Sequence, residues 1–348
     1  MKNNLSEKKV LIGMSGGVDS SAAVCILKDK GFEVSGAFCI MHDFYENALE
    51  DAKKVAKDLE IDFFVLDVRD EFEKIVIADF LNCYKSGRTP NPCIVCNPNV
   101  KFKALLKKAD EIGTKYIATG HYARISNENG RYYIKSAENK LKDQSYMLYR
   151  LSQEVLERVI FPLGDMYKED VRNFARENNI NVASKPDSQE ICFIPDKDYV
   201  SFIEKRLGKF PKGNFIAPEG TVCGEHKGII NYTVGQRKGL NIALGQPVFI
   251  KKIDPLKNEI YLSYKGGEFF EEVFFEDTVF MKISEIKEQI SCNAKVRYST
   301  KTEKCTVEHL ENGSYRAYFK DKVRAPAKGQ SIVFYDDEDN ILFGGFIK

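Results

Sequence analysis

The stretch KKVLIGMSGGVDSSAAVCILKDK at residues 8–30 changes periodicity across a glycine turn. Residues 8–14 are a short apolar run, which predicts a buried strand. From Val18 to Lys30, apolar Val18, Ala22, Cys25 and Leu27 recur at helical spacing, and Gly31 follows as a stop signal. The stretch therefore predicts a strand, a tight glycine turn and a helix, which is the opening unit of an α/β fold.

The turn between strand and helix, SGGVDS at residues 15–20, has the composition of a phosphate-binding loop. Gly16 and Gly17 let the backbone approach a phosphate without a Cβ in the way, and the helix N-terminus offers free N–H groups. Hydroxyls come from Ser15, Ser20 and Ser21, while Asp19 is expected to hold Mg²⁺ against the pyrophosphate. No lysine follows in the G-K-[ST] arrangement, so the loop is of the PP-loop kind and not a Walker loop. Enzymes with this loop cleave ATP between the α and β phosphates to adenylate an oxygen.

Strand and helix patterns alternate over the rest of the N-terminal half. Strands are expected at 33–40, 62–68 and 115–119, and helices at 45–59, 71–84 and 101–112. Such alternation indicates a parallel sheet covered by helices. We predict a doubly wound α/β catalytic domain over residues 1–205.

Beyond Phe210 the sequence becomes β-rich. The segment PKGNFIAPEG at 211–220 is interpreted as a turn-rich boundary, followed by strands at 247–253 and 259–264. Later apolar runs have the spacing of a small antiparallel barrel and fall at 292–298, 305–309, 315–319, 331–335 and 341–347. The predicted domains are a central β-rich domain at 206–270 and a C-terminal β-barrel at 271–348.

Composition narrows the class of protein. The 52 basic and 51 acidic residues nearly cancel, so net charge alone predicts no nucleic-acid partner, although a local basic face would suffice for one. No apolar run has the length of a signal peptide or of a membrane span, so we expect a cytoplasmic protein with no membrane partner. In a reducing compartment, clustered cysteines favour metal or redox chemistry over structural disulfides. Six scattered cysteines are interpreted as small hydrophobic residues: Cys25, Cys39, Cys83, Cys223, Cys292 and Cys305.

The remaining three cysteines fall in two motifs. RTPNPCIVCN at 88–97 contains Cys93 and Cys96 and is expected to be a proline-rigid loop, not a helix or a central strand. KPDSQEICF at 185–193 contains Cys192, just beyond a short helix expected to end near residue 179. Spacing alone leaves three possibilities: half a zinc site, an iron–sulfur cluster with an open iron, or a sulfur-exchanging thiol pair. Zinc is the weakest of these, because no fourth Cys or His stands at ligand spacing.

Nearly the whole chain resembles the tRNA-specific 2-thiouridylases (MnmA/TrmU family). The resemblance lies in motifs that occur in the family's order: GMSGGVDSS, GRTPNPCIVCN, ATGHYAR, KDQSYMLYRL, FPLG, DSQEICFIP, YTVGQRKGL, KVRY and the late Lys328-Gly329-Gln330. It implies ATP-dependent adenylation of the wobble uridine at C2, followed by sulfur transfer. The implied partners are tRNA, through the anticodon stem-loop of tRNAs for Lys, Glu and Gln, and a cysteine desulfurase or sulfur relay protein.

The resemblance also implies roles for individual residues. Cys192 would accept sulfur as a persulfide, and Cys96 would attack that persulfide or close a disulfide with Cys192 after transfer. ATP would be contacted by Gly13, Met14, Ser15, Gly16, Gly17, Val18, Asp19, Ser20, Cys39 and Gly120. Asn91, Pro92 and Cys93 would lie at the target base, and tRNA would also meet His121, Lys142, Asp143, Gln144, Arg297, Tyr298 and Gln330.

Two positions depart from the family pattern. Many members have aspartate in place of Cys93 and methionine in place of Cys39. The second change is a soft exchange in an apolar position. The first removes a carboxylate and adds a third cysteine, which leads to an alternative hypothesis: a [4Fe–4S] cluster held by Cys93, Cys96 and Cys192.

Three further interpretations stay open. Lys101, Lys103, Lys107 and Lys108 are expected to form a solvated helix face. The competing classes of protein are a PP-loop ligase or amidotransferase acting on a small molecule, and an iron–sulfur or RNA-binding regulator with an inactive loop. The two separate cysteine motifs argue against the first class, and the intact SGGVDS argues against the second.

Overall fold

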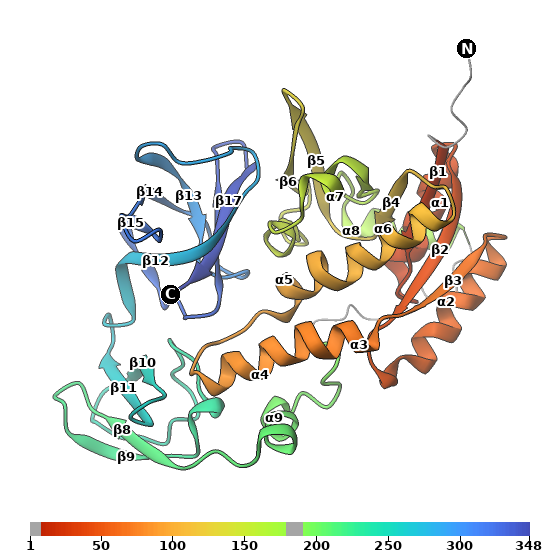
Figure 1. Ribbon diagram of the computed structural model, residues 1–348. Coiled ribbons are helices and arrows are strands. Elements are labelled where there is room, and N and C mark those ends of the chain that lie inside the picture. The colour runs from red at the N-terminus through yellow and green to blue at the C-terminus, as the bar shows by residue number, and fades with distance from the viewer. Residues whose placement is uncertain (1–7, 179–190) are drawn as a thin grey trace. The chain divides into compact units, whose positions relative to one another are not determined.

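A computed structural model of the protein describes residues 8–178 and 191–348 (Figure 1). The chain divides into two compact units. Within the described residues, the first unit takes in Met1–Val76, Cys93–Phe193 and Asp339–Ile341, and the second takes in Ile77–Pro92, Ile194–Glu338 and Leu342–Lys348.

The first unit is built on a parallel sheet of five strands in the order β3-β2-β1-β4-β7. The strands are β1 (Lys9–Gly13), β2 (Glu33–Ile40), β3 (Phe63–Asp67), β4 (Tyr116–Thr119) and β7 (Val159–Ile160). Gly13 at the end of β1 lies opposite Ala37 of β2 and Thr119 of β4. Val10, Ile12 and Leu27 are among the buried residues of its core. The predicted parallel α/β sheet is confirmed.

Helices of the first unit connect these strands. They are α1 (Val18–Asp29), α2 (Glu46–Asp58), α3 (Arg69–Phe72), α5 (Pro92–Cys96), α6 (Phe102–Glu111), α7 (Gln153–Arg158) and α8 (Lys168–Glu177), with short 3-10 turns at Asp43–Tyr45 and Ser145–Leu148. A hairpin that the sequence patterns did not predict, β5 (Ala123–Glu128) and β6 (Arg131–Ser136), follows the end of β4. The predicted helix at 71–84 is interrupted by a wide π-type turn at Glu73–Ile77, which precedes α4 (Ala78–Lys85).

The segment around the first cysteine pair is a helix, so the prediction of a rigid loop over residues 88–97 is wrong from Pro92 onward. Helix α5 begins at Pro92, a π-type turn follows at Asn97–Lys101, and α6 continues from Phe102. Proline is well tolerated in the first turn of a helix, where its missing N–H has no intrahelical partner to lose and its fixed φ is already helical. The prolines mark the start of this helix and do not exclude it.

The second unit contains a small sheet in the order β10-β11-β8-β9, preceded by α9 (Tyr199–Leu207). Its strands are β8 (Gly213–Ile216), β9 (Val222–His226), β10 (Val248–Asp254) and β11 (Glu259–Tyr264), and a 3-10 turn spans Ile229–Asn231. Strand β8 falls inside the segment 211–220 that we expected to be only a boundary. Phe215 explains the difference, because it is fully buried and pairs with both neighbouring strands.

The same unit ends in a closed antiparallel barrel of six strands in the order β12-β15-β14-β13-β16-β17. The bounds are β12 (Phe269–Phe280), β13 (Ile290–Lys295), β14 (Glu303–His309), β15 (Tyr315–Arg324), β16 (Ser331–Tyr335) and β17 (Ile341–Ile347). The predicted β-rich centre and C-terminal barrel are therefore confirmed as architecture, while their boundaries at 206 and 271 stay predictions. Within the described residues, no helix has the length and apolar character needed to span a membrane.

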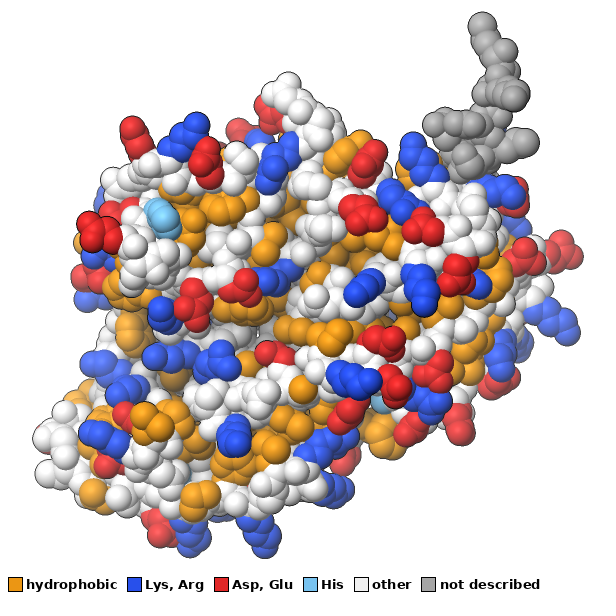
Figure 2. Space-filling model, in the orientation of Figure 1, with side chains coloured by type: hydrophobic (Ala, Val, Ile, Leu, Met, Phe, Trp, Pro, Cys, Tyr) orange, Lys and Arg blue, Asp and Glu red, His pale blue; other side chains and the backbone are white. Residues whose placement is uncertain are grey.

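Four of the six scattered cysteines are buried as expected: Cys25, Cys83, Cys292 and Cys305. Cys39 and Cys223 are half-buried. Acidic and basic side chains are interspersed over the face seen in Figure 2, in keeping with a net charge near zero.

Candidate active site

The phosphate loop follows β1 and ends at the N-terminus of α1. Gly16 has a φ of +70°, and a Cβ on it would lie 2.4 Å from the Ala48 carbonyl oxygen. Gly17 is the N-cap of α1, and no side chain caps the first N–H groups there. The loop therefore requires glycine at Gly16, and no side chain makes a capping hydrogen bond at the start of α1, whose first turn contains Asp19.

The serines of this loop brace it from within. The Ser15 N–H donates to the Ser20 hydroxyl at 3.1 Å, and the Ser20 hydroxyl donates to the Gly17 carbonyl at 3.1 Å. Ser21 also donates to that carbonyl, at 3.0 Å, and is fully buried. Ser21 thus holds the first turn of α1 and is not placed to offer a hydroxyl to a ligand.

Asp19 is paired with two residues that sequence reasoning missed. The Lys168 ammonium, at the start of α8, lies 2.7 Å from both Asp19 carboxylate oxygens. The Tyr122 hydroxyl donates to Asp19 Oδ1 at 2.9 Å. Lys168 is only 7% exposed, so this positive charge is held inside the protein beside the loop. No local pattern reveals it, because 149 positions separate Lys168 from Asp19.

The residues after β4 support the same loop. A Cβ on Gly120 would lie 3.0 Å from the Asp19 carbonyl carbon and the Ser20 nitrogen, so only glycine allows this close approach. The Gln144 side chain accepts a hydrogen bond from the Tyr122 N–H at 3.0 Å, and the Gln144 N–H donates to the Tyr122 carbonyl at 2.8 Å. Gln144 therefore holds Tyr122 in place, and Tyr122 in turn contacts Asp19.

Asp143, which we expected at the tRNA, has its carboxylate turned inward. It is 5% exposed and accepts hydrogen bonds from the Ala137 N–H at 2.8 Å and from the Ser145 hydroxyl at 2.7 Å. These bonds shape the chain between β6 and the Ser145–Leu148 turn. Lys142, its neighbour, is half-buried.

Cys93 and Cys96 lie one helical turn apart on α5. Cys96 is buried, and its thiol lies 3.8 Å from the Met41 sulfur. Burial raises the pKa of Cys96 to about 12. Cys93 keeps exposed surface although protein atoms surround it, and this burial also raises its pKa. Both thiols are therefore protonated at neutral pH when nothing else acts on them.

Cys192 belongs to a segment that is distant from Cys93 and Cys96 in the sequence. It is exposed, and a negative charge on it would raise the pKa of both Cys93 and Cys96. The backbone of Cys192 is hydrogen-bonded to His42, whose pKa is lowered by burial. Cys192 is therefore close enough to Cys93 and Cys96 to act electrostatically on both thiols. Residues 185–190 of the second cysteine motif lie outside the described residues.

Cys39 lies near the end of β2 and also acts electrostatically on Cys96. Burial raises the pKa of Cys39 to about 11. Cys39, which we expected at ATP, therefore also lies within electrostatic reach of Cys96.

His121 follows β4 and is held between aromatic rings. Its ring stacks on Phe102 with centroids 6.0 Å apart and meets the edge of Phe161 at 6.1 Å. Its Nδ1 lies 2.7 Å from the Thr119 hydroxyl oxygen. Burial lowers the pKa of His121 to about 3, so the ring is neutral and offers hydrogen bonding and stacking without a charge.

Two of the predicted tRNA residues of the second unit, Arg297 and Gln330, donate side-chain hydrogen bonds to backbone carbonyls. Gln330 donates to the carbonyls of Thr89 and Pro90 at 2.9 and 3.1 Å, which fixes the chain just before Asn91 and Pro92. The Arg297 guanidinium donates to the Val234 carbonyl at 2.7 Å and to the Ala325 carbonyl at 2.7 and 3.1 Å. Tyr298 is 38% exposed.

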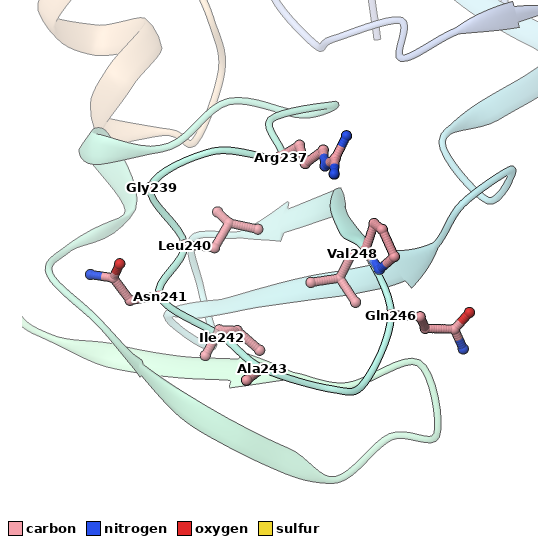
Figure 3. Close-up of a pocket in the computed structure, with 9 residues that line it drawn as sticks. Arg237, Gly239, Leu240, Asn241, Ile242, Ala243, Gln246 and Val248 are labelled. Carbon is pink, nitrogen blue, oxygen red and sulfur yellow. The ribbon is translucent and has the colours of Figure 1, made fainter.

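The same unit has a shallow cavity of about 410 Å³ lined by Arg237, Leu240, Ile242 and Val248, among others (Figure 3). Part of its wall is the end of the YTVGQRKGL motif. None of the predicted catalytic residues lines it, so cavity volume does not locate the chemistry of this protein.

The cluster hypothesis finds no support. Across residues 8–178 and 191–348, no group of three or more His, Cys, Asp or Glu side chains is arranged to hold a metal ion. Cys96 is buried, and its thiol contacts the Met41 sulfur.

A parallel sheet, an uncapped glycine-serine loop and converging thiols define a nucleotide-binding α/β protein with sulfur chemistry at its sheet edge. Models of three protein domains match the chain: a tRNA methyl transferase HUP domain at 8–196, a tRNA methyl transferase PRC-barrel domain at 200–264 and an aminomethyltransferase beta-barrel domain at 270–347.

Characterised relatives match over almost the full length. The chain is 45% identical to the tRNA-specific 2-thiouridylase MnmA of Clostridium acetobutylicum, covering 98% of this chain and 99% of the relative. It is 46% identical to the tRNA-specific 2-thiouridylase MnmA 1 of Clostridium tetani, covering 98% and 96%. The chain belongs to the family of tRNA-specific 2-thiouridylases.

Solved structures match only part of the chain. An NH3-dependent NAD synthetase from Campylobacter jejuni is 17% identical over 52% of this chain and 72% of its own, with a TM-score of 0.34. A 4-thiouridine synthetase in complex with RNA and ATP is 16% identical over 58% and 50%, with a TM-score of 0.38.

Proposed function

We propose that this chain is an ATP-dependent tRNA-uridine 2-sulfurtransferase, which replaces the C2 oxygen of the wobble uridine by sulfur in the cytoplasm. The observation that carries the proposal is that the phosphate loop and the cysteine site lie at the same edge of one sheet. The phosphate loop follows Gly13 of β1, Cys39 and the Cys96 contact Met41 lie at the end of β2, and Gly120 and His121 follow β4. Open parallel sheets bind ligands at this carboxyl edge.

The first half-reaction is adenylation of the base. The uracil O2 attacks the α-phosphorus of ATP, a C2–O–P linkage forms, and pyrophosphate leaves. Charge accumulates on the departing pyrophosphate, for which we propose a position beside the N-terminus of α1. Fixed positive charge at such a position lowers the barrier, because it needs no rearrangement when the negative charge develops.

Mg²⁺ does not fit Asp19 as the residue stands. Both Asp19 carboxylate oxygens lie 2.7 Å from the Lys168 ammonium, and Oδ1 also accepts from Tyr122. A divalent ion would reach Asp19 only by displacing that lysine. We therefore derive no step through Mg²⁺ at Asp19, and the Asp19–Lys168 ion pair, which carries no net charge, is assigned the role of holding the loop.

The second half-reaction delivers sulfur. A cysteine desulfurase or a relay protein loads Cys192 as a persulfide. The Cys96 thiolate then attacks the Cys192 sulfur, a Cys96–Cys192 disulfide forms, and hydrosulfide leaves. Hydrosulfide adds to the activated C2, AMP departs and 2-thiouridine results. An external dithiol reduces the disulfide, which returns two electrons and completes the cycle.

For tRNA we propose contacts from Asn91, Pro92 and Cys93 at the target base, and from His121, Lys142 and Tyr298 elsewhere. Four further predicted residues have polar side-chain atoms that are hydrogen-bonded within the protein, and we propose that they hold the contacting segments in place. They are Asp143, Gln144, Arg297 and Gln330. The substrates are the tRNAs for Lys, Glu and Gln.

The test is direct. Nucleosides from tRNA of a strain that lacks the gene are compared by mass spectrometry with those of the parent strain. Loss of wobble 2-thiouridine and its return on complementation support the proposal, and unchanged 2-thiouridine contradicts it. The purified protein should also release pyrophosphate from ATP only when substrate tRNA is present.

A further inference from the structure

The helix that carries Cys93 and Cys96 changes its winding directly after Cys96. Pro98 has no N–H, so it cannot donate to the Ile94 carbonyl four residues earlier. The chain makes a wider π-type turn over Asn97–Lys101, in which the Phe102 N–H donates to the Asn97 carbonyl. Wide turns of this kind within α-helices are frequent at functional sites.

The wider turn changes where Lys101 lies. In a regular α-helix, residues five apart are separated by about 140° around the axis, so Lys101 would face away from Cys96. In a π-type turn, residues five apart are joined by a hydrogen bond, as Phe102 is to Asn97. Lys101, the residue five positions after Cys96, is therefore turned less far from the face of Cys96 than in a regular α-helix. Lys101 is half-buried, whereas Lys103 and Lys107 on the same helix are exposed. The expected solvated face is therefore exposed at Lys103 and Lys107, while Lys101 and Lys108 are half-buried.

The charge of Lys101 acts on groups from three elements. It lowers the pKa of Cys39 from β2, of Cys93 and Cys96 from α5, and of His121 after β4, in the first three cases against the effect of burial. Among the described residues, the other titratable groups that act on Cys96 are three thiols, whose ionised forms would raise its pKa: Cys39, Cys93 and Cys192. Among these groups Lys101 is thus the cation, and it lies half-buried at the end of the wide turn that follows Cys96.

We propose that Lys101 is a positioning residue of the sulfur site, whose ammonium group stabilises anionic sulfur on Cys96 and Cys93. The inference rests on the proposed function for its purpose, because the thiolate is the form that attacks a persulfide. The ionisation itself is simple: the thiol loses its proton to water, and the negative sulfur remains beside Lys101. Pro98 is the sequence feature that puts the lysine there.

The experiment measures thiol ionisation without tRNA, ATP or sulfur donor. Full-length protein is alkylated with iodoacetamide over a range of pH, and mass spectrometry follows each cysteine separately. Well below a pKa, one unit changes the thiolate fraction about tenfold, so Lys101→Met should slow Cys96 alkylation by about 3- to 30-fold at about pH 8. Lys101→Arg should keep the wild-type rate, and Lys103→Met serves as the matched control that removes an exposed lysine two positions on.

Three outcomes are informative. Slower alkylation of Cys96 in Lys101→Met, with Cys292 and Cys305 in the barrel still protected, supports the proposal. Unchanged Cys96 alkylation overturns it, and a fall in tRNA affinity with a shallower salt dependence would then make Lys101 a phosphate ligand. If Lys101→Met does not fold, Lys101→Gln gives the same comparison. Because the reaction is alkylation, the result stands or falls separately from 2-thiouridine formation.

Discussion

The phosphate loop leads into the N-terminus of α1, and the cysteine helix is α5; both lie at the same edge of one sheet. They differ in how their sequences specify the local structure. The loop is a contiguous motif in which Gly16 and Gly17 supply backbone geometry directly. The cysteine helix begins with a proline, changes winding at a second proline, and receives Cys192 from far along the chain. At each site a lysine that does not belong to the motif lies nearby: Lys168 is paired with Asp19, and Lys101 follows the cysteine helix. The motifs therefore predict the backbone of each site but do not contain these charged residues.

The largest expected effect separates sulfur chemistry from nucleotide chemistry. Cys192→Ser should reduce 2-thiouridine formation by more than about 100-fold, because it removes the sulfur carrier. ATP-dependent pyrophosphate release and tRNA affinity should remain. Nucleoside mass spectrometry measures the product, and Cys223→Ser, at a half-buried thiol in β9, is the control. Retention of more than a few per cent of activity would contradict the assignment.

Cys96→Ser should be nearly as inactive but for a different reason. Loading of Cys192 precedes the step that needs the Cys96 thiolate, so this variant should accumulate persulfide on Cys192. Intact-protein mass spectrometry after incubation with a desulfurase and cysteine shows the added sulfur. A variant that cannot be loaded would reverse the roles of the two cysteines.

On the nucleotide side, Lys168→Met should slow tRNA-dependent pyrophosphate release by about 100-fold, because it leaves the Asp19 carboxylate beside the phosphate loop without its ammonium partner. Asp19→Ala should also abolish adenylation and leave tRNA affinity nearly unchanged. Because Asp19 and Lys168 form one ion pair, the double variant should be little worse than either single variant. Glu169→Gln, at the exposed next position, is the control. Fully additive losses would show that the pair does not act as a unit.

A smaller effect is expected in the second unit. Arg297→Ala removes bonds to the Val234 and Ala325 carbonyls and should lower the free energy of unfolding by about 1–3 kcal/mol. Urea denaturation measures it, with Arg297→Lys as an intermediate case. The salt dependence of tRNA binding should not change, because the guanidinium is bonded to backbone. A salt slope reduced by about one would instead identify a phosphate contact.

The smallest effect is expected at the position that departs from the family. Cys93→Asp restores the common residue in the first turn of a helix, where a carboxylate is favoured by the helix dipole. Thiolation should change by less than about threefold, since Cys96 and Cys192 remain. Single-turnover assays decide this. Loss of activity in Cys93→Asp would show that the third cysteine has become essential to sulfur transfer in this chain.

The elements with strong local periodicity could be predicted from the sequence. Strands β2, β11, β16 and β17 have the predicted bounds, and the phosphate loop lies where its glycines indicated. These features depend on neighbours in the chain: alternating burial, glycine at positive φ, and a helix stop. The helix at Pro92 was missed because proline was interpreted as a loop residue, although the first turn of a helix accepts it.

Contacts between distant segments could not be predicted from the sequence. Lys168 reaches Asp19 because the start of α8 lies beside the start of α1. The Asp143 carboxylate, predicted at the tRNA, accepts hydrogen bonds from buried donors. The physical reason is common to both. A charge is costly to bury without a partner, and the partner that makes burial possible is chosen by proximity in space, which spacing along the chain does not record.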